Sequence, residues 1–349
     1  MSFLTKYKPL ILEDLKTKLL SATDEVELQT QWIDVFKRLS LFSENGKMAR
    51  GSIFLFTCTM FGKKINNDLL SIASAIEIFH GGILIHDDIM DLDRMRRGGE
   101  TVFVQYENEL QKIGADNPQH IGKSLAICAG DIGFFLAYQF LSETKLPHRT
   151  ISKLTTFFSK ELVQLGITQM IDCVNIVGKP ESEEEVLSLY KNKTARYTFS
   201  LPFIAAALVC NQPQSMKDVL FELGEQIGIM FQIQDELLGL FGDEKETGKA
   251  VGADIRENRK TLYKTYLYEI ANKEESKKLN TIFGNKMITA VEIEYVRSQV
   301  KENKVDERIS KLIENYHTVA AVNVEKLSVS KDYKKQIQEL ITFIITRTR

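Results

Sequence analysis

The sequence predicts an all-α protein that forms one large multi-helix bundle. Hydrophobic residues recur with a helical period along most of the 349 residues, and no segment shows a convincing alternation of apolar and polar residues. Helix breakers are few, because the chain contains only 6 prolines and 20 glycines. The breaks between periodic segments are short and polar, so we expect a single domain spanning residues 1–349.

The helical pattern is local and can be assigned segment by segment. We expect helices at residues 9–20, 69–90, 124–142, 151–175, 184–210, 217–241 and 261–271, with several more after residue 288. Segments 69–86 and 157–177 are apolar almost all round, which is typical of helices inside a bundle. Such a bundle can enclose a deep central cavity. The stretch 272–335 is rich in charge, and we interpret it as a solvated outer face.

Composition excludes several classes of function. Hydrophobic residues make up 44% and charged residues 26% of the chain, as in ordinary soluble proteins. The net charge of −2 gives no reason to expect nucleic acid or an anionic membrane as a partner. No apolar run approaches the roughly 18 to 20 residues needed to cross a bilayer, so we expect no stable membrane insertion.

The cysteines favour a cytoplasmic location. Cys58, Cys128, Cys173 and Cys210 lie far apart in apolar surroundings, and no two of them form a CxxC pair. We therefore expect reduced core residues rather than disulfides or a zinc site.

The stretch HDDIMDLDRMRRG breaks a local rule of helix design. Its acids Asp87, Asp88 and Asp91 follow an apolar helical segment, although acids near a helix C-terminus oppose the macrodipole and repel one another. Such a break usually marks function. Asp87 and Asp91 share one helix face, where oxygen ligands favour Mg²⁺. Arg96 and Arg97 follow at once and suit phosphate oxygens, so the stretch predicts a polyphosphate ligand.

A second acid pair lies in FQIQDELLGLFGDEKETGKAVGAD. Asp235 and Glu236 follow an apolar helix that also carries Gln232. Basic residues come next, namely Lys249, Arg256, Arg259 and Lys260. Two acidic helices, each followed by cations, suit one diphosphate held through bridging Mg²⁺.

A basic turn lies near the N-terminus, in ENGKMARG. Lys47 and Arg50 in this turn suit a second anion. A basic surface turn without function is the alternative interpretation.

Together these motifs resemble those of the trans-isoprenyl diphosphate synthases, also called the polyprenyl synthetase family, and most of all the geranylgeranyl diphosphate synthases. HDDIMDLDRMRRG is similar to the first aspartate-rich motif, FQIQDE to the second, and GKMAR to the Gly-Lys-x-x-Arg element. The resemblance extends from about Lys47 to Lys260 by motif and to the C-terminus by length. It implies the isoprenoid synthase fold and a homodimer.

The resemblance also implies a reaction. Such an enzyme condenses isopentenyl diphosphate with an allylic diphosphate (dimethylallyl, geranyl or farnesyl) by ionisation, condensation and proton elimination. Mg²⁺ and basic groups stabilise the leaving diphosphate, and apolar walls exclude water from the cation. No protein nucleophile is needed.

The family's roles are carried over position by position. About three Mg²⁺ ions are implied, held by Asp87, Asp91 and Asp235. The residues implied to bind the allylic diphosphate are Arg96, Lys193 and Lys249, with Asp88 also in the catalytic set. The residues implied to bind isopentenyl diphosphate are Lys47, Arg50, His80 and Arg97. Gln232 and Thr194 are implied to line the reacting region, and Arg259 stands where the family has a Lys.

Residues that precede Asp87 on the same helix bear on product length. Ile83, Gly82 and Phe79 lie four, five and eight residues before it, about one and two turns below the acids. Gly82 predicts room for a growing chain and Phe79 a lower floor, which favours a product of about C20, with longer ones possible. Close helix packing at Gly82 is the alternative, and side chains from other helices, such as Phe134, Phe135 and Met170, can overrule this assignment.

Three other functions remain open. The second motif has Gly239 where many relatives have Asp, which is compatible with a noncatalytic or partner-dependent subunit. The pairs Glu77-x-x-His80 and Glu314-x-x-His317 match half of a carboxylate-bridged di-iron pattern. A terpene cyclase shares the first motif, but its usual second motif does not fit the residues here.

Overall fold

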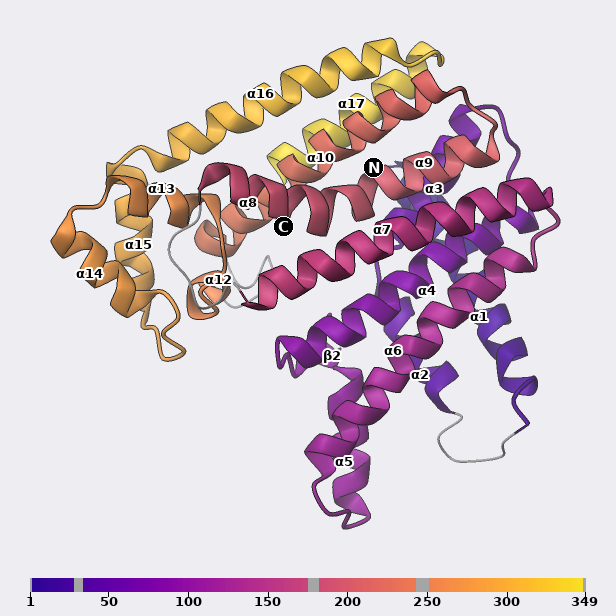
Figure 1. Cartoon of the computed structure of the whole chain (residues 1–349), viewed down its shortest axis with the longest axis horizontal. Helices are drawn as coiled ribbons and strands as arrows, with labels where there is room; N and C mark the ends of the chain where they lie inside the picture. Colours follow the sequence, from indigo (N-terminus) through magenta and orange to yellow (C-terminus); the bar gives the residue numbers. More distant parts are fainter. Residues whose placement is uncertain (1, 28–33, 175–181, 243–250, 348–349) are drawn as a thin grey trace. The chain divides into compact units, whose positions relative to one another are not determined.

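The structure is a computed structural model that describes residues 2–27, 34–174, 182–242 and 251–347 (Figure 1). It divides into two compact units. The N-terminal unit comprises Met1–Thr156 and Ala205–Asn211, and the C-terminal unit comprises Phe157–Ile204 and Gln212–Arg349. The boundary falls within α7 (His148–Val174) and within α9 (Leu201–Val209). Nearly all of the described elements are helices, so the all-α prediction is confirmed.

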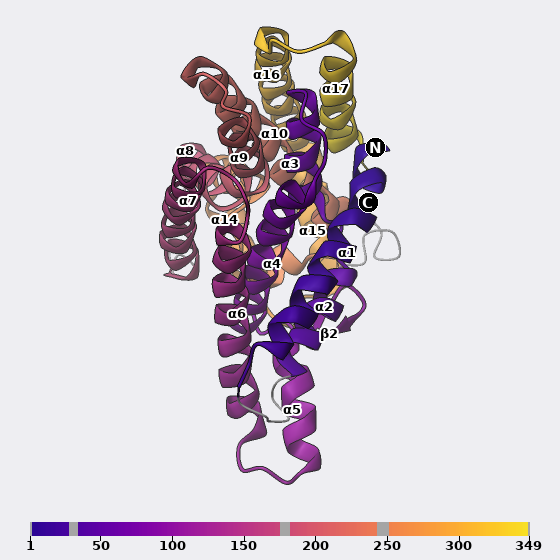
Figure 2. The same cartoon turned by 90° about the vertical axis from the view of Figure 1, so that its right-hand side faces the viewer.

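The N-terminal unit is built around the helix that carries the first acidic motif. Its elements are α1 (Ser2–Asp24), α2 (Val35–Glu44), α3 (Ala49–Met60), α4 (Asn67–Met90), α5 (Val102–Lys112) and α6 (Pro118–Ser142). Helix α4 packs against α1, α3 and α6, and α5 pairs with α6 (Figure 2). The side chain of Asn66 caps α4 by accepting a hydrogen bond from the backbone N–H of Leu69. This packing agrees with the apolar surface predicted for residues 69–86.

A short β-hairpin follows α4. Strands β1 (Met95–Arg96) and β2 (Gly99–Glu100) pair antiparallel, with Arg96 opposite Gly99. The two turn residues, Arg97 and Gly98, have φ of 54° and 79°. Two consecutive left-handed residues are typical of a type I′ turn. Arg97 is an unfavourable choice in this conformation, which is a first indication that its side chain is needed there.

The structure corrects the expectation about membrane-length helices. Both α4 and α6 are long and apolar enough, by length and composition alone, to cross a bilayer. In α4, however, 72% of the most apolar window is buried inside the protein, and the helix contains the buried acid Glu77. We interpret α4 as a core helix. The same window of α6 is only 44% buried.

The cysteine expectation is wrong for two of the four residues. All four are free thiols. Cys58 is buried and Cys210 is half-buried, but Cys128 in α6 and Cys173 in α7 are exposed. An exposed cysteine on an apolar helix looks like a core residue in the sequence, because periodicity does not tell which apolar face is covered.

The C-terminal unit is organised around the helix of the second acidic motif. Its elements are α8 (Glu183–Leu189), the π-helix η3 (Tyr190–Ser200), α10 (Gln214–Phe241), α12 (Ala253–Arg256), α13 (Leu262–Ile270), α14 (Lys273–Ile282), α15 (Ala290–Glu302), α16 (Val305–Lys326) and α17 (Lys331–Thr346). Helix α10 contacts η3, α16 and α17 (Figure 1). The charge-rich helices keep apolar residues such as Val296, Val300 and Ile309 buried. Their charged side chains form a solvated face.

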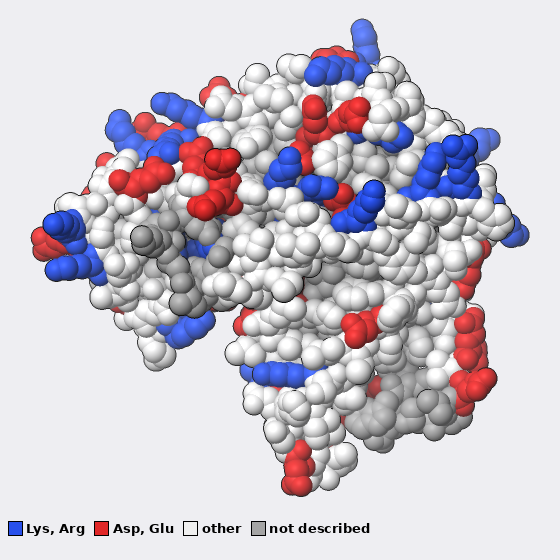
Figure 3. Space-filling model, viewed as in Figure 1, with Lys and Arg blue, Asp and Glu red and all other residues white. Residues whose placement is uncertain are grey.

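Charged side chains do not gather in a single patch on the face shown in Figure 3. On the face shown in Figure 3, acidic and basic residues lie in small groups of either sign, separated by uncharged surface.

Candidate active site

The first acidic motif lies in the last turn of α4 and the residues that end it. The backbone N–H of Asp91 donates to the carbonyl of Asp87 at 2.8 Å, and that of Asp93 donates to the carbonyl of Asp88 at 2.9 Å. Leu92, with φ of 57°, ends the helix in the left-handed region. Asp87 and Asp91 are partly exposed one turn apart, whereas Asp88 is only 1% exposed. The helix therefore separates the three acids into two roles.

Asp88 holds Arg96. The Nε of Arg96 donates to Oδ1 of Asp88, and its Nη2 lies 3.5 Å from Oδ2 of Asp93. Among the described residues, Oδ2 of Asp88 is buried without a hydrogen-bond partner. Burial raises the pKa of Asp88 to about 7, although the charge of Arg96 opposes this shift. Asp88 is thus placed to orient Arg96.

A second group in the N-terminal unit is basic and gathers around His80. Burial lowers the pKa of His80 well below its usual value, and the charges of Arg50, Arg97 and Arg96 lower it further. A Cβ added to Gly46 would lie 2.9 Å from Nη1 of Arg97, so Arg97 reaches the turn that carries Lys47. Of the predicted isopentenyl diphosphate residues, Arg50, His80 and Arg97 therefore lie close together in this unit. A neutral imidazole among arginines suits an anion.

Glu77 supports this basic group from beneath. Its Oε1 accepts a hydrogen bond of 2.7 Å from the backbone N–H of Gly51 at the start of α3. Burial raises its pKa, while the Gly51 hydrogen bond and the charges of Arg50 and Arg97 oppose the shift. Glu77 therefore stabilises the turn and the arginines rather than a metal.

The surroundings of Glu77 and His80 do not favour the di-iron alternative. Glu77 and His80 face the cations Arg50 and Arg97, as a buried anion-binding group would. Within residues 2–27, 34–174, 182–242 and 251–347, no three His, Cys, Asp or Glu side chains form a group that could hold a metal by themselves. Mg²⁺ remains compatible, since it takes one or two carboxylates and completes its shell with water and phosphate. The all-oxygen pair Asp87 and Asp91 fits that requirement.

In the C-terminal unit, α10 approaches η3 closely. Gly224 and Gly228 lie one turn apart on one face of α10. A Cβ on Gly228 would lie 2.2 Å from Cα of Ala195, and one on Gly224 would lie 2.6 Å from Cα of Ser200. Glycine is therefore required at both positions. The next residues on this face are Gln232 and, one turn further, Glu236 of the second motif.

The π-helix positions Lys193 and Thr194 against this face. Oγ1 of Thr194 donates to Oε1 of Gln232 at 2.9 Å, and Nε2 of Gln232 donates to Oε1 of Glu236 at 3.3 Å. The hydroxyl of Tyr190 donates to Oε2 of Glu236. Burial raises the pKa of Glu236 well above its usual value, and the nearby charge of Asp254 adds to this effect. π-Helices often mark functional sites, as the predicted role of Thr194 suggests here.

Asp172 is a candidate site residue that the sequence interpretation missed. Lys193 donates to Oδ2 of Asp172 through Nζ, and Nη1 of Arg259 lies 3.8 Å from the same oxygen. The charge of Asp172 also raises the pKa of Lys260, which burial lowers. Asp172 thus gathers three cations in the C-terminal unit. Its signal in the sequence was an acid near the end of an apolar helix, as in both motifs.

Two residues outside the second acidic motif lie beside it. Oδ1 of Asp235 lies 3.3 Å from Nη2 of Arg347, a residue that the motifs did not indicate. A Cβ on Gly239 would lie 3.3 Å from Oδ2 of Asp254, which belongs to α12. A carboxylate from another helix therefore lies beside the position where the motif lacks one. Lys249 lies outside the described residues.

The structure corrects the interpretation of Gly82. A Cβ at this position would lie 2.7 Å from the carbonyl oxygen of Gly130 and 2.7 Å from Cε1 of Phe134, both on α6. The space expected for a growing chain is filled by Phe134, which stacks on Phe79 with ring centroids 4.7 Å apart. Close helix packing thus accounts for Gly82. Ile83 is half-buried one residue further along.

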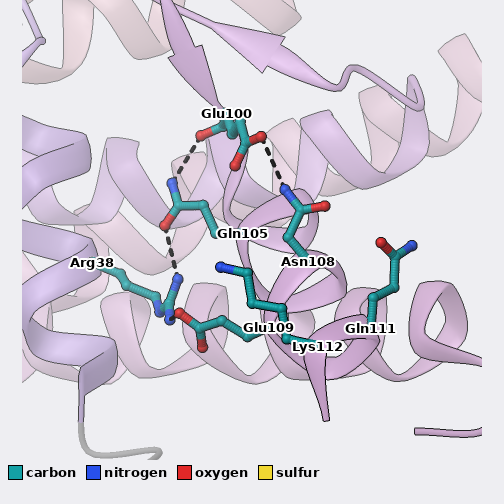
Figure 4. A pocket seen from close by; sticks show the side chains of 7 residues that line it. All are labelled: Arg38, Glu100, Gln105, Asn108, Glu109, Gln111 and Lys112. Atoms are coloured by element: carbon teal, nitrogen blue, oxygen red, sulfur yellow. Dashed lines mark hydrogen bonds and ion pairs between the residues drawn. The ribbon is translucent and has the colours of Figure 1, made fainter. Parts of the chain in front are cut away.

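A polar cavity of about 620 Å³ lies elsewhere in the N-terminal unit (Figure 4). Its lining residues are Arg38, Glu100, Gln105, Asn108, Glu109, Gln111 and Lys112. Arg38 points toward Gln105 and Glu109 and donates to both, at 3.0 and 2.5 Å (Figure 4). It also pairs with Asp34. None of the residues predicted for catalysis lines this cavity, and we interpret its ion pairs as support between α2 and α5.

Comparison with known proteins tests the resemblance. A family model described as polyprenyl synthetase matches residues 37–300. A geranylgeranyl diphosphate synthase of Sulfolobus acidocaldarius is 31% identical, covering 88% of this chain and 89% of the relative. A short chain isoprenyl diphosphate synthase of Methanocaldococcus jannaschii is 31% identical, covering 88% and 87%.

Solved structures agree on the fold. The crystal structure of a geranylgeranyl pyrophosphate synthase from Corynebacterium glutamicum, complexed with isoprenyl diphosphate and magnesium, has a TM-score of 0.90. It is 24% identical and covers 98% of this chain and 99% of its own. The isoprenoid synthase fold expected from the motifs is therefore confirmed. By the family match and by its relatives, this chain belongs to the polyprenyl synthetase family.

Proposed function

We propose that this chain is a Mg²⁺-dependent prenyltransferase that condenses isopentenyl diphosphate with an allylic diphosphate. The names of its relatives support this reaction and a product of about C20, such as geranylgeranyl diphosphate. The observation that carries the proposal is the pairing of Asp88 with Arg96 beside the partly exposed acids Asp87 and Asp91. Acids for a metal and an oriented cation for phosphate then lie at one helix end.

The N-terminal unit supplies most of the anion-binding groups. Asp87 and Asp91 would hold Mg²⁺, and Arg96, oriented by Asp88, would donate to the allylic diphosphate. The diphosphate of isopentenyl diphosphate would be held by Lys47, Arg50, His80 and Arg97. His80 stays neutral beside these arginines, so it would donate one N–H without adding to their repulsion.

The C-terminal unit supplies the remaining groups. Asp235 would complete a set of about three Mg²⁺ ions, and Asp254 would offer the carboxylate that Gly239 lacks. Lys193, Lys249 and Arg259 would contact the allylic diphosphate. When bound, Mg²⁺ would stabilise the charge that develops on the leaving diphosphate.

Gln232 and Thr194 would line the reacting region of the site. We propose that residues 1–349 act as one catalytic domain.

We further propose a cytoplasmic homodimer that uses α6. This helix exposes Ile127 and Phe135, with 46% and 74% of their surfaces accessible, and Cys128 lies on the same side. An exposed apolar stripe on a well-formed helix is typical of an interface. The four free thiols are compatible with a reducing compartment.

The test is turnover by the purified protein. It would be incubated with Mg²⁺, labelled isopentenyl diphosphate and, separately, dimethylallyl, geranyl or farnesyl diphosphate, and product length would be measured. We expect a product of about C20 that disappears in Asp87→Ala and persists in the control Asp116→Ala, an exposed acid in the turn before α6. Tight diphosphate binding without turnover for any primer would instead indicate a noncatalytic subunit.

A further inference from the structure

A chain of hydrogen bonds runs through the C-terminal unit and ends at Thr194. The backbone N–H of Leu262 donates to the hydroxyl oxygen of Tyr190 at 3.0 Å, and Tyr190 donates to Oε2 of Glu236. Nε2 of Gln232 donates to Oε1 of Glu236 at 3.3 Å, and Oγ1 of Thr194 donates to Oε1 of Gln232 at 2.9 Å. Every member lies on η3, α10 or the start of α13.

Glu236 sets the direction of this chain. In the structure the amide nitrogen of Gln232 lies against Oε1 of Glu236, so this carboxylate oxygen accepts from Gln232. The amide oxygen of Gln232 then faces Thr194 and takes the hydroxyl proton. Because the hydroxyl proton is already donated to Gln232, Thr194 can interact with any other group only through its two oxygen lone pairs.

Burial makes this direction hard to reverse. Tyr190 and Glu236 are only 4% and 6% exposed, so water does not compete for their hydrogen bonds. Both carboxylate oxygens of Glu236 are engaged within the chain, whereas its neighbour Asp235 faces Arg347. The two acids of the second motif therefore have different environments, and Glu236 does not behave as a metal ligand here.

We propose that Tyr190 and Glu236 are positioning residues that act through Gln232, so that Thr194 presents its oxygen lone pairs to the allylic carbocation. The proposal rests on the proposed function, which assigns Thr194 to the reacting region. Lone pairs stabilise a developing positive charge, whereas an O–H dipole pointed at it would raise the barrier. Because the hydroxyl is oriented before reaction, no reorganisation is needed as the charge forms.

Glu236→Gln should reverse the direction of the hydrogen bonds between residue 236, Gln232 and Thr194, with little change in side-chain volume. If its amide oxygen accepts from Tyr190, its NH₂ group faces Gln232, whose own amide must turn over to avoid two opposed donors. Thr194 then accepts from Gln232 and points its proton outward. The opposite orientation of the new amide would leave the Tyr190 proton without an acceptor in a buried site, which is costly.

Kinetics should separate this effect from a structural one. We expect Glu236→Gln to lower kcat on the order of tenfold or more, with KM for both substrates within about threefold of the wild type. Tyr190→Phe should change kcat in the same direction. The matched control is Tyr266→Phe. Tyr266 is a buried tyrosine of α13 whose hydroxyl bonds to Glu183, which is not part of this series of hydrogen bonds, so the kcat of the variant should stay unchanged.

A double-mutant cycle tests whether Glu236 acts through Thr194. Thr194→Val removes the hydroxyl and keeps the shape of the side chain. If the chain is a unit, Glu236→Gln should cost little more once the hydroxyl is absent. Additive losses in kcat would overturn the proposal.

Binding gives a readout that does not need turnover. The probes are a protonated tertiary-amine analogue of the allylic cation and its uncharged carbon isostere, each with Mg²⁺ and pyrophosphate. The wild type should prefer the amine, and Glu236→Gln should lose about tenfold of that preference. If the wild type turns over and Glu236→Gln keeps the same preference for the amine, the positioning proposal is overturned but the proposed function is not. A wild type that neither turns over nor prefers the amine would overturn both.

Discussion

Phe134→Ala tests how product length is set. Phe134 stands on α6, stacks on Phe79 and meets the ring of His86 edge-on at 5.1 Å. Its ring fills the space over Gly82 on the helix of the first motif. If the growing chain runs down α4 from the acids, the first large obstacle is therefore Phe134.

The size of the effect follows from the atoms removed. Truncation to Ala deletes the six ring carbons, and one isoprene unit adds five carbons, so the new space admits about one further condensation. Because Phe134 is half-buried, we expect a loss of about 2 kcal/mol in the free energy of unfolding, below the range for a fully buried Phe. The variant should therefore remain folded and active.

The assay compares product length from farnesyl diphosphate and excess isopentenyl diphosphate. We expect a shift from about C20 in the wild type to about C25 and longer in Phe134→Ala. Phe343→Ala is the matched control, since that ring on α17 is 46% exposed and belongs to none of the proposed binding groups, and its products should not change. An unchanged product in a folded, active Phe134→Ala protein would show that the chain does not pass the level of Gly82.

Three further predictions concern stability and metal binding. Gly228→Ala should reduce the free energy of unfolding by 3 kcal/mol or more, as roughly expected for overpacking against backbone, whereas Gly166→Ala, with open space around it, should be neutral or stabilising in denaturant titrations. Because the folded state lowers the pKa of His80, the unfolded state binds the additional proton below about pH 6.5. Unfolding free energy should then fall from pH 7 to 5, and a fall of equal size in His80→Gln would contradict this assignment. Arg347→Ala removes a cation from Asp235, so Mg²⁺ should raise the melting temperature of the variant more than that of the wild type; equal shifts would count against competition.

Local patterns predicted the helices and the acids, because helical periodicity depends only on near neighbours in the chain. Asp87 and Asp91 lie one turn apart at the end of α4, as their spacing required. Residues that come together only through the packing of different helices were harder to predict from the sequence. Asp172 was missed although Lys193 donates to it, since one helix does not reveal which side chains another helix will bring to it.

The glycines show where this limit lies. A buried helical glycine costs about 1 kcal/mol relative to Ala, so its presence predicts a close neighbour across the helix. The neighbour of Gly82 is the ring of Phe134, so this glycine allows close helix packing. The neighbour of Gly239 is the carboxylate of Asp254. Gly239 looked like a lost ligand because Asp254, the acid beside it, lies on α12, outside the motif. A degenerate motif therefore argues against catalysis only after the space left by the missing side chain has been inspected.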